Sequence, residues 1–455
     1  MASQKKIACI GAGYVGGPTM AVIAQKCPQC TVTVVDINQK RINDWNSDTL
    51  PFYEPGLDDI VNTVRGKNLF FSTEVEKAII ENDIIFIAVN TPTKDYGVGK
   101  NMAADLQHWE TIARQIRNVA RSNKIIIEKS TLPVKTAEAM EIILNTGSQF
   151  HFEVMSNPEF LAEGTAVNNL LSPDRVLIGS RETESGQKAR NELVEIYKSW
   201  VPLEKIITTN TFSAELTKLV SNAFLAQRVS SINAVSAICE ATGADVDEVS
   251  KAVGADSRIG AKFLKASVGF GGSCFRKDIL NLVYICRMYH LHEIATYFEN
   301  IINMNSFQQQ RFVDNIVQSM FNTVAGRKIC MLGCAFKACT DDVRDSPALS
   351  VATTLIAEKA NLVISDPKAM TNMKAALGDL KNVEFIDDPY QAAKKCHAIV
   401  IITEWDVYAT LDYKKLFDRM VKPAYLFDGR NMVNRKTCYD IGFNVYSIGK
   451  EPLIH

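Results

Sequence analysis

The sequence predicts an α/β protein with two Rossmann-like, doubly wound parallel-sheet domains joined by a central helical region. Short, almost uninterrupted apolar segments alternate with helical segments in two separate regions of the 455-residue chain. This alternation is typical of parallel sheets that helices cover on both faces. Between the two regions, residues 214–240 contain neither Pro nor Gly and keep helical spacing of their apolar side chains. A chain of this length exceeds one ordinary core, so two or three domains are expected.

The first α/β region begins with a dinucleotide-binding pattern. Glycines Gly11, Gly13 and Gly16 follow the first apolar strand and open a helix of small residues. In this setting the glycines allow a tight turn and a close approach of the backbone to a pyrophosphate. A tight turn without a ligand is the alternative. The strands predicted in this region are residues 6–10, 31–36, 83–90, 124–128 and 151–155.

The second strand ends in an acidic residue, Asp36. A carboxylate at this place accepts hydrogen bonds from a ribose 2′-hydroxyl and repels a 2′-phosphate, which favours NAD over NADP. Arg41 lies close by and weakens this preference, because an arginine can accommodate a 2′-phosphate.

The second α/β region repeats the pattern of the first. Residues 70–89 align without gaps with residues 384–403 in strand, acidic helix start, helix and buried strand. The second region has Gly333 but lacks the full glycine pattern, so we expect it to hold a different ligand. Its predicted strands are residues 327–332, 361–366 and 398–403, and the predicted domains are 1–210 (NAD-binding), 211–322 (helical) and 323–455 (binding the second ligand).

Bulk properties exclude several classes of function. The net charge is −1 and no basic stretch is long enough to suggest nucleic acid. The longest apolar runs are too short to span a bilayer, and the first residues lack a signal-peptide pattern, so we expect a cytoplasmic protein. Eleven cysteines, an odd number, argue against a disulfide framework. Cys27 and Cys30 have no second such pair and no nearby His, so no metal is expected.

Cys274 is the most informative thiol. It follows three glycines within five positions and precedes a helix predicted at residues 279–288, whose N-terminus would stabilise a thiolate. Beside a nicotinamide site, such a thiol can trap an aldehyde as a thiohemiacetal; loss of a second hydride gives a thioester, and water then releases an acid. An inert packing thiol is the alternative, and most of the other cysteines are expected to be of that kind.

Two further groups of polar residues have a functional and a structural interpretation. Lys218 and Asn222 are four positions apart and therefore share one face of the predicted long helix. This face is either exposed to solvent or part of a site. Glu159 and Glu163 follow a predicted strand, either as exposed acids of a turn or as acid-base candidates that need a partner.

Taken together, these segments resemble one family, the UDP-glucose 6-dehydrogenases, and most closely its eukaryotic members. The resemblance covers essentially the whole chain. It is carried by residues 11–16 with Asp36, 53–57, 89–93, 128–133, 156–165, 218–224, 269–278, 335–337 and 341–347. The resemblance implies a cytoplasmic homo-oligomer, at least a dimer and as large as a hexamer, that pairs through its helical region and binds NAD and UDP-glucose.

The resemblance also implies a role for individual residues. The implied catalytic residues are the nucleophile Cys274, the oxyanion-stabilising pair Lys218 and Asn222, the acid-base residue Glu159, and Thr131 and Asp278, which hold the hydrolytic water. The implied NAD contacts are Gly11, Gly13, Tyr14, Val15, Gly16, Asp36, Arg41, Val89, Asn90, Thr91, Pro92, Thr93, Ser130, Thr131, Glu163, Cys274 and Arg344. The implied substrate contacts are Glu159, Phe160, Leu161, Ala162, Glu163, Lys218, Asn222, Lys265, Ala266, Ser267, Val268, Gly269, Phe270, Gly271, Phe336, Lys337 and Arg430, with Arg258 reaching into the neighbouring subunit's site.

Other functions remain as alternatives. A sister dehydrogenase would act on a UDP-N-acetylhexosamine or on GDP-mannose. A non-enzymatic nucleotide-sugar sensor is disfavoured, because a pure binder needs no nucleophile such as Cys274. A plain hydroxyacid dehydrogenase would leave both the thiol and the second α/β region unexplained.

Overall fold

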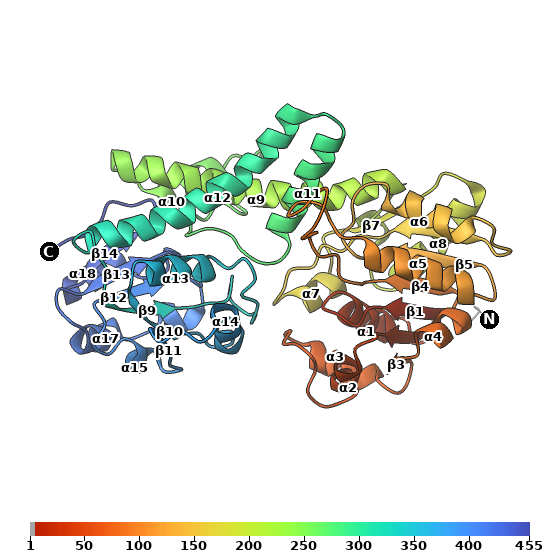
Figure 1. The fold of residues 1–455 in the computed structure, drawn as a ribbon, viewed down its shortest axis with the longest axis horizontal. Helices are drawn as coiled ribbons and strands as arrows, with labels where there is room; N and C mark the ends of the chain where they lie inside the picture. The colour runs from red at the N-terminus through yellow and green to blue at the C-terminus, as the bar shows by residue number, and fades with distance from the viewer. Residues whose placement is uncertain (1–4) are drawn as a thin grey trace. The chain divides into compact units, whose positions relative to one another are not determined.

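The computed structural model describes residues 5–455 and separates into two compact units (Figure 1). Unit 1 comprises the described residues up to Ser221 together with Leu280–Leu291, and unit 2 comprises Asn222–Ile279 and His292–His455. Both boundaries fall inside helices, α9 (Thr211–Thr242) and α11 (Phe275–Met288). The predicted three-domain division is finer than these two units and stays a prediction.

Unit 1 is built on an eight-stranded sheet with the order β3-β2-β1-β4-β5-β6-β7-β8. The strands from β3 to β6 pair in parallel, as predicted. Strand β7 pairs with β6 in the antiparallel direction, and β8 extends the sheet parallel to β7, so the outer end of the sheet departs from the predicted parallel pattern. The strands are β1 Lys6–Ile10, β2 Thr31–Val35, β3 Leu69–Ser72, β4 Ile84–Ile87, β5 Lys124–Glu128, β6 Phe152–Ser156, β7 Val176–Ser180 and β8 Ile206–Asn210.

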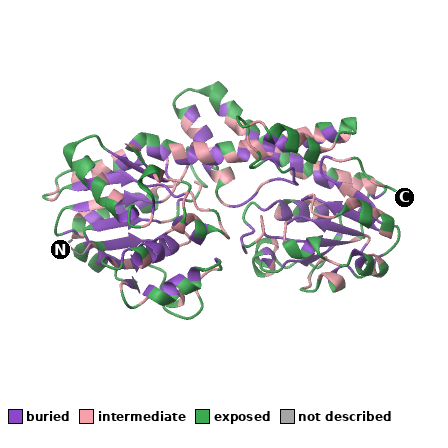
Figure 2. Cartoon of the chain, turned by 180° about the vertical axis from the view of Figure 1, so that it is seen from behind, coloured by how far each residue is buried: buried purple, intermediate pink, exposed green. Residues whose placement is uncertain are grey.

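Helices cover both faces of this sheet. One hydrophobic cluster packs side chains of α1, α3, α7 and α8 against one face, and a second packs α4, α5 and α6 against the other. The inner strands β1, β4, β5, β6 and β7 are almost entirely buried, as the purple arrows of Figure 2 show. The helices are α1 Gly16–Lys26, α2 Gln39–Trp45, α3 Leu57–Val64, α4 Val75–Glu81, α5 Gln107–Val119, α6 Thr136–Asn145, α7 Ala166–Leu171 and α8 Glu184–Tyr197.

The register of the parallel strands brings their carboxyl ends to one edge. Ile10 at the end of β1 pairs with Val35 of β2, and Ile87 of β4 pairs with Glu128 of β5. The glycine turn and the segments after β2, β4 and β5 therefore leave the sheet at the same edge. Ligands of doubly wound sheets bind at this edge, which makes it the place for the predicted cofactor site.

Unit 2 contains a six-stranded parallel sheet with the order β11-β10-β9-β12-β13-β14. Two hydrophobic clusters cover its two faces. The strands are β9 Lys328–Leu332, β10 Asn361–Ser365, β11 Val383–Phe385, β12 Ala398–Ile401, β13 Tyr425–Asp428 and β14 Asn444–Ser447. The helices are α10 Val246–Gly254, α12 His292–Ser319, α13 Pro347–Ala357, α14 Met370–Leu377, α15 Pro389–Ala392, α16 Asp406–Ala409, α17 Tyr413–Arg419 and α18 Arg435–Ile441.

The first turns of the two sheets have the same hydrogen bonds. The N–H of Gly11 donates to the β2 carbonyl of Val35, and the N–H of Gly333 donates to the β10 carbonyl of Ser365, both at 2.8 Å. In unit 2, Asp366 is the counterpart of Asp36, but its carboxylate also accepts a hydrogen bond from the indole of Trp405, at 3.1 Å. A ring therefore lies against the unit 2 carboxylate, consistent with a different ligand there.

The predicted fold class is confirmed, because the chain forms two Rossmann-like sheets and the residues between them in the sequence form helices. The structure lengthens two predicted helices, since the stretch predicted at 214–240 is α9 and the helix predicted at 279–288 is α11, which begins at Phe275. Within the described residues 5–455, no helix combines the length and apolar character needed to cross a membrane. The cytoplasmic location and the pairing role of the helical region stay predictions.

Candidate active site

The glycine turn of unit 1 has the form of a pyrophosphate cradle. A methyl group added at Gly13 would meet no atom within 4 Å, so the backbone is open there. Helix α1 begins at Gly16, and no side chain in the described part of the chain caps its first turn. Uncapped N–H groups at a helix start attract phosphate oxygens. The residues present therefore fit the predicted NAD.

Asp36 is held in place at the end of β2. Its carboxylate accepts hydrogen bonds from the N–H groups of Ala12 and Asn38, at 3.0 and 2.9 Å, and forms an ion pair with Arg41 at 2.9 Å. The nearby arginine thus engages the carboxylate in this structure. The Asp36 carboxylate lies at the end of β2, where a ribose hydroxyl would bind.

The neighbouring strand ends are tied together at the same edge. The Ser130 hydroxyl donates to the carbonyl of Val89 at 2.6 Å, and the Thr91 hydroxyl donates to the carbonyl of Thr131 at 3.1 Å. The predicted NAD contacts after β4 and β5 therefore form one connected layer. Asn90, Pro92 and Thr93 belong to the same segment after β4.

A buried acid, Glu54, joins the glycine turn to the predicted substrate segment. The Tyr14 hydroxyl donates to its carboxylate, and so do the N–H groups of Gly164 and Ala166, at 2.8 and 2.7 Å. Burial raises the pKa of Tyr14, and the hydrogen bond to Glu54 raises it further, which keeps the phenol a donor. This contact orders the backbone directly after Glu163.

The predicted acid-base residue has a cationic partner. Lys218 of α9 forms an ion pair with Glu159 at 3.0 Å, and both side chains are buried, with 4% and 8% of their area exposed. Burial alone would raise the pKa of Glu159, but the Lys218 charge and the N–H of Leu161, at 2.6 Å, hold it below its ordinary value. Glu159 is therefore a carboxylate at neutral pH. The structure thus supplies the partner that sequence spacing did not reveal.

The thiol of Cys274 lies at the start of a helix. Its residue directly precedes α11, and its carbonyl accepts a hydrogen bond from the N–H of Asp278 at 2.9 Å, which closes the first turn. Cys274 is exposed, so a substrate can reach its thiol. Asp278 is buried and accepts a hydrogen bond from the Asn222 amide at 2.6 Å, so these two predicted catalytic residues are in direct contact.

The loop before Cys274 needs glycine at Gly272. Its φ is +87°, and a methyl group there would lie 2.9 Å from the ring of Phe336. The Gly272 N–H also donates to the carbonyl of Arg344 at 2.9 Å. The backbone of this loop therefore lies close to a ring and to a backbone segment of the same unit.

Most predicted substrate residues of unit 2 surround one cavity of about 250 Å³. The cationic side chains of Lys265, Lys337 and Arg430 and the carboxylate of Glu404 line it, a surplus of two positive charges. Arg430 is fixed by Glu404 at 3.0 Å and by the carbonyl of Phe336 at 3.0 Å. Such a surplus matches the charge of a diphosphate. The remaining predicted residues on this cavity are Ala266, Ser267, Gly269, Phe270, Gly271 and Phe336.

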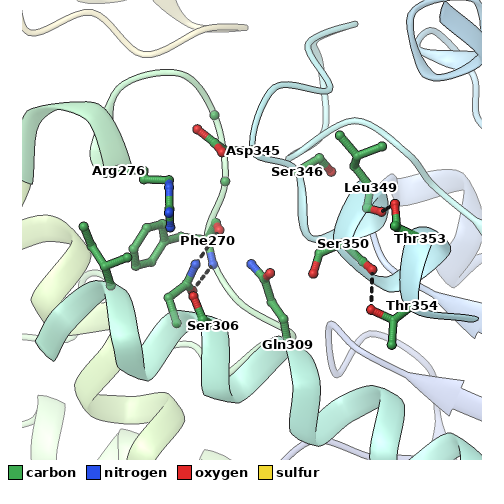
Figure 3. Close-up of a pocket in the computed structure, with 14 residues that line it drawn as sticks. Phe270, Arg276, Ser306, Gln309, Asp345, Ser346, Leu349, Ser350, Thr353 and Thr354 are labelled. Carbon is green, nitrogen blue, oxygen red and sulfur yellow. Dashed lines mark hydrogen bonds between the residues drawn. The ribbon is translucent and has the colours of Figure 1, made fainter. Parts of the chain in front are cut away.

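A second cavity of about 340 Å³ lies between α12, α13 and the loop that carries Phe270 (Figure 3). Its walls are mostly polar, with hydroxyl groups from Ser306 and Ser350 and the charged side chains of Arg276 and Asp345. Asn305 anchors Phe270 through two backbone hydrogen bonds of 2.9 and 3.0 Å. The loop is thus supported from the α12 side.

Several predicted residues lie away from these groups. Val268 is buried and lines neither cavity, and its N–H donates to the carbonyl of Gly429. Arg258 is exposed and forms an ion pair with Asp256 at 2.6 Å, and Arg344 is paired with Asp342 at 2.6 Å in unit 2. Ala162 is exposed and Glu163 half-buried. Within the described residues, no group of His, Cys, Asp or Glu could hold a metal ion.

The sequence reasoning missed polar residues that support this site. Glu54, Lys129 and Asn157 bind predicted site residues or line a cavity with them. Lys129 and Asn157 directly follow β5 and β6, which was a usable signal because site residues gather at strand ends. Arg175 and Tyr197 line the same cavity, and no local pattern would have indicated them.

Comparison with known proteins finds matches to one family along most of the chain. Three models of the UDP-glucose/GDP-mannose dehydrogenase family match it: the NAD binding domain over residues 5–201, the central domain over 212–307 and the UDP binding domain over 330–435.

Two plant proteins are similar over nearly their full length. UDP-glucose 6-dehydrogenase 1 of Arabidopsis thaliana is 56% identical over 98% of this chain and 97% of its own. UDP-glucose 6-dehydrogenase 1 of Glycine max is 57% identical over the same shares.

Solved structures have the same fold. A UDP-glucose dehydrogenase from Pyrobaculum islandicum superimposes with a TM-score of 0.86 at 29% identity, covering 99% of both chains. A UDP-D-ManNAc dehydrogenase from Pyrococcus horikoshii superimposes with a TM-score of 0.81 at 25% identity, covering 98% of this chain and 99% of its own.

Proposed function

Because this chain belongs to the UDP-glucose/GDP-mannose dehydrogenase family, we propose that it oxidises UDP-glucose to UDP-glucuronate through a thioester on Cys274. It is an NAD-dependent enzyme, and its glycine turn and Asp36 are the residues to hold that cofactor. The observation that carries the proposal is the exposed Cys274 at the start of α11, in the unit whose cationic cavity suits a diphosphate.

We propose that the cationic cavity of unit 2 binds the UDP moiety. Lys265, Lys337 and Arg430 would neutralise the two phosphate charges, and the ring of Phe336 offers an apolar surface to the uracil. Glu404 keeps the guanidinium of Arg430 fixed before substrate arrives, which lowers the ordering cost of binding.

In the proposed reaction, side chains of this protein transfer the protons and stabilise the negative charges that form on oxygen. NAD, when bound, supplies the acceptor for one hydride in each of the two oxidations. Lys218 and Asn222 would stabilise the alkoxide that forms when the sugar C6 hydroxyl loses its proton. The Cys274 sulfur would then add to the aldehyde carbon, giving a thiohemiacetal that never leaves the protein.

The last proposed step is hydrolysis of the thioester. Glu159, held as a carboxylate by Lys218, would take a proton from a water that Thr131 and Asp278 position. The oxygen of this water would bond to the acyl carbon, the carbon–sulfur bond would break, and the thiol would recover a proton. One UDP-glucose and one water would thus give one acid and two reduced cofactors.

The stoichiometry tests this proposal. We expect about two NADH for each limiting UDP-glucose and no aldehyde in solution, because the intermediate stays bound to sulfur. NADH absorbance and an aldehyde-trapping reagent give both numbers. A ratio near one, or trapped aldehyde, would exclude the thioester route. Parallel assays with UDP-N-acetylhexosamines and GDP-mannose separate UDP-glucose from the sister substrates.

We also propose that Arg258 serves the site of a neighbouring subunit in a homo-oligomer. Its side chain is 87% exposed and lines neither cavity of its own unit 2. Mixing Arg258→Ala chains with Cys274→Ala chains should restore activity, since a mixed dimer regains one site with both residues. Mass spectrometry must confirm exchange of subunits; exchange without recovery would place Arg258 outside any shared site.

A further inference from the structure

A second buried lysine, Lys129, lies beside the Lys218–Glu159 pair of unit 1. It directly follows β5, and 5% of its surface is exposed. Lys129 and Glu159 both line a small cavity of about 80 Å³. Neither the glycine turn nor the proposed reaction assigns Lys129 any role.

The hydrogen-bond partners of Lys129 are neutral. Its ammonium donates to the amide oxygen of Asn157 at 3.0 Å and to the hydroxyl of Tyr197 at 3.3 Å. The Tyr197 hydroxyl donates to the same amide oxygen at 2.6 Å, and the Asn157 amide N–H donates to the carbonyl of Leu177 at 2.7 Å. This network fixes the amide with its oxygen toward Lys129, and among residues 5–455 no carboxylate is hydrogen-bonded to this ammonium.

A buried ammonium of this kind is costly, so it loses its proton readily. Burial lowers the pKa of Lys129 to about 8; the Glu159 charge opposes this effect and the Lys218 charge adds to it, while burial raises the pKa of the nearby Cys9 to about 12 and leaves its thiol uncharged. Asp174 and Arg175 line the same cavity with opposite charges. Below about pH 8, the three residues Lys129, Lys218 and Glu159 therefore contain two ammonium charges and one carboxylate.

We propose that Lys129 is a positioning residue that offsets the charge of Glu159, so that the charge of Lys218 stays available to a substrate oxyanion. Lys218 and Glu159 alone would sum to zero, and a neutral pair attracts an oxyanion weakly. With Lys129 protonated, the group has a surplus positive charge in a buried setting where charges act strongly. This inference rests on the proposed function, in which Lys218 stabilises oxyanions.

The test compares turnover across pH. Lys129→Met keeps the length of the side chain and removes the charge. Its kcat for UDP-glucose oxidation should be roughly tenfold below that of the wild-type enzyme at pH 6.5. The deficit should close to within about twofold at pH 9.5, where the wild-type Lys129 has itself lost its proton. The KM for NAD should not change.

Lys124 provides a matched control. It is a buried lysine of the same strand β5, and burial lowers its pKa too, but its ammonium donates to the carbonyls of Ile80 and Asn82. Lys124→Met should change thermal stability and leave the pH dependence of kcat as in wild type. A deficit in Lys129→Met that is the same at every pH would overturn the proposal, because a structural role has no reason to fade above pH 8.

A second variant covers the case in which Lys129→Met does not fold. Tyr197→Phe removes one acceptor from the ammonium, so Lys129 should lose its proton at a lower pH. Turnover should equal that of wild type at pH 6.5 and fall below it between pH 7 and 8; an unchanged profile would contradict the proposal. NADH formation by the wild-type enzyme in the same assay tests the proposed function separately. If the wild-type enzyme formed no NADH, the proposed function would be excluded independently of the role of Lys129.

Discussion

Replacing Cys274 by serine is expected to lower the rate of UDP-glucuronate formation by roughly three orders of magnitude or more. A thiol has a reference pKa of about 8.5, and its thiolate is the nucleophilic form. An alcohol at the same place ionises far less, so it adds poorly to the aldehyde, and an ester formed on it hydrolyses slowly. Binding should persist, because the unit 2 cavity is unchanged. A uronate assay and intact-protein mass spectrometry measure turnover and trapped sugar.

Cys339 gives a matched control for this experiment. It and Cys274 are the two exposed cysteines among the described residues. Cys339→Ser should leave turnover within about twofold of wild type, because it removes a thiol of similar exposure that has no proposed role. A Cys274→Ser enzyme with near-normal uronate formation would make Cys274 a packing residue and remove the basis of the thioester mechanism.

Replacing Lys218 by methionine is expected to damage both stability and turnover. The substitution leaves the buried Glu159 carboxylate without its ion-pair partner, and breaking one side of a buried pair costs about 3–5 kcal/mol. The thermal midpoint of the transition of unit 1 should therefore fall by roughly 5–15 °C. Loss of a charge that stabilises oxyanions should lower kcat by about a hundredfold or more. Calorimetry and steady-state kinetics measure the two effects.

A double variant separates the two effects of Lys218. Adding Glu159→Gln to Lys218→Met removes the stranded carboxylate, so most of the lost thermal stability should return. Turnover should stay as low as in the single variant, or fall further, because both proposed catalytic groups are absent. If stability does not return, Lys218 stabilises the fold through contacts other than its pair with Glu159.

Local pattern was sufficient to predict the framework of this molecule. Apolar runs predicted β1, β5 and β9 to within one residue, because the central residues of a parallel strand that helices cover on both faces are apolar. Gly11 and Asp36 were predictable because the glycine pattern directly follows one apolar strand and the acidic residue directly ends the next. Strand β7 was not predicted, because its antiparallel pairing with β6 depends on how the chain returns to the sheet.

The sequence alone determined the fold class, the cofactor turn and the identity of the candidate nucleophile, since each depends on periodicity or on neighbours within one turn or strand. Only the tertiary structure decided which charges meet. Glu159 and Lys218 are 59 positions apart and form one buried pair, and Glu54 holds the N–H of Gly164 across 110 positions. The protonation state of such buried groups depends on partners and burial that folding alone brings together, so no pattern along the chain could have specified it.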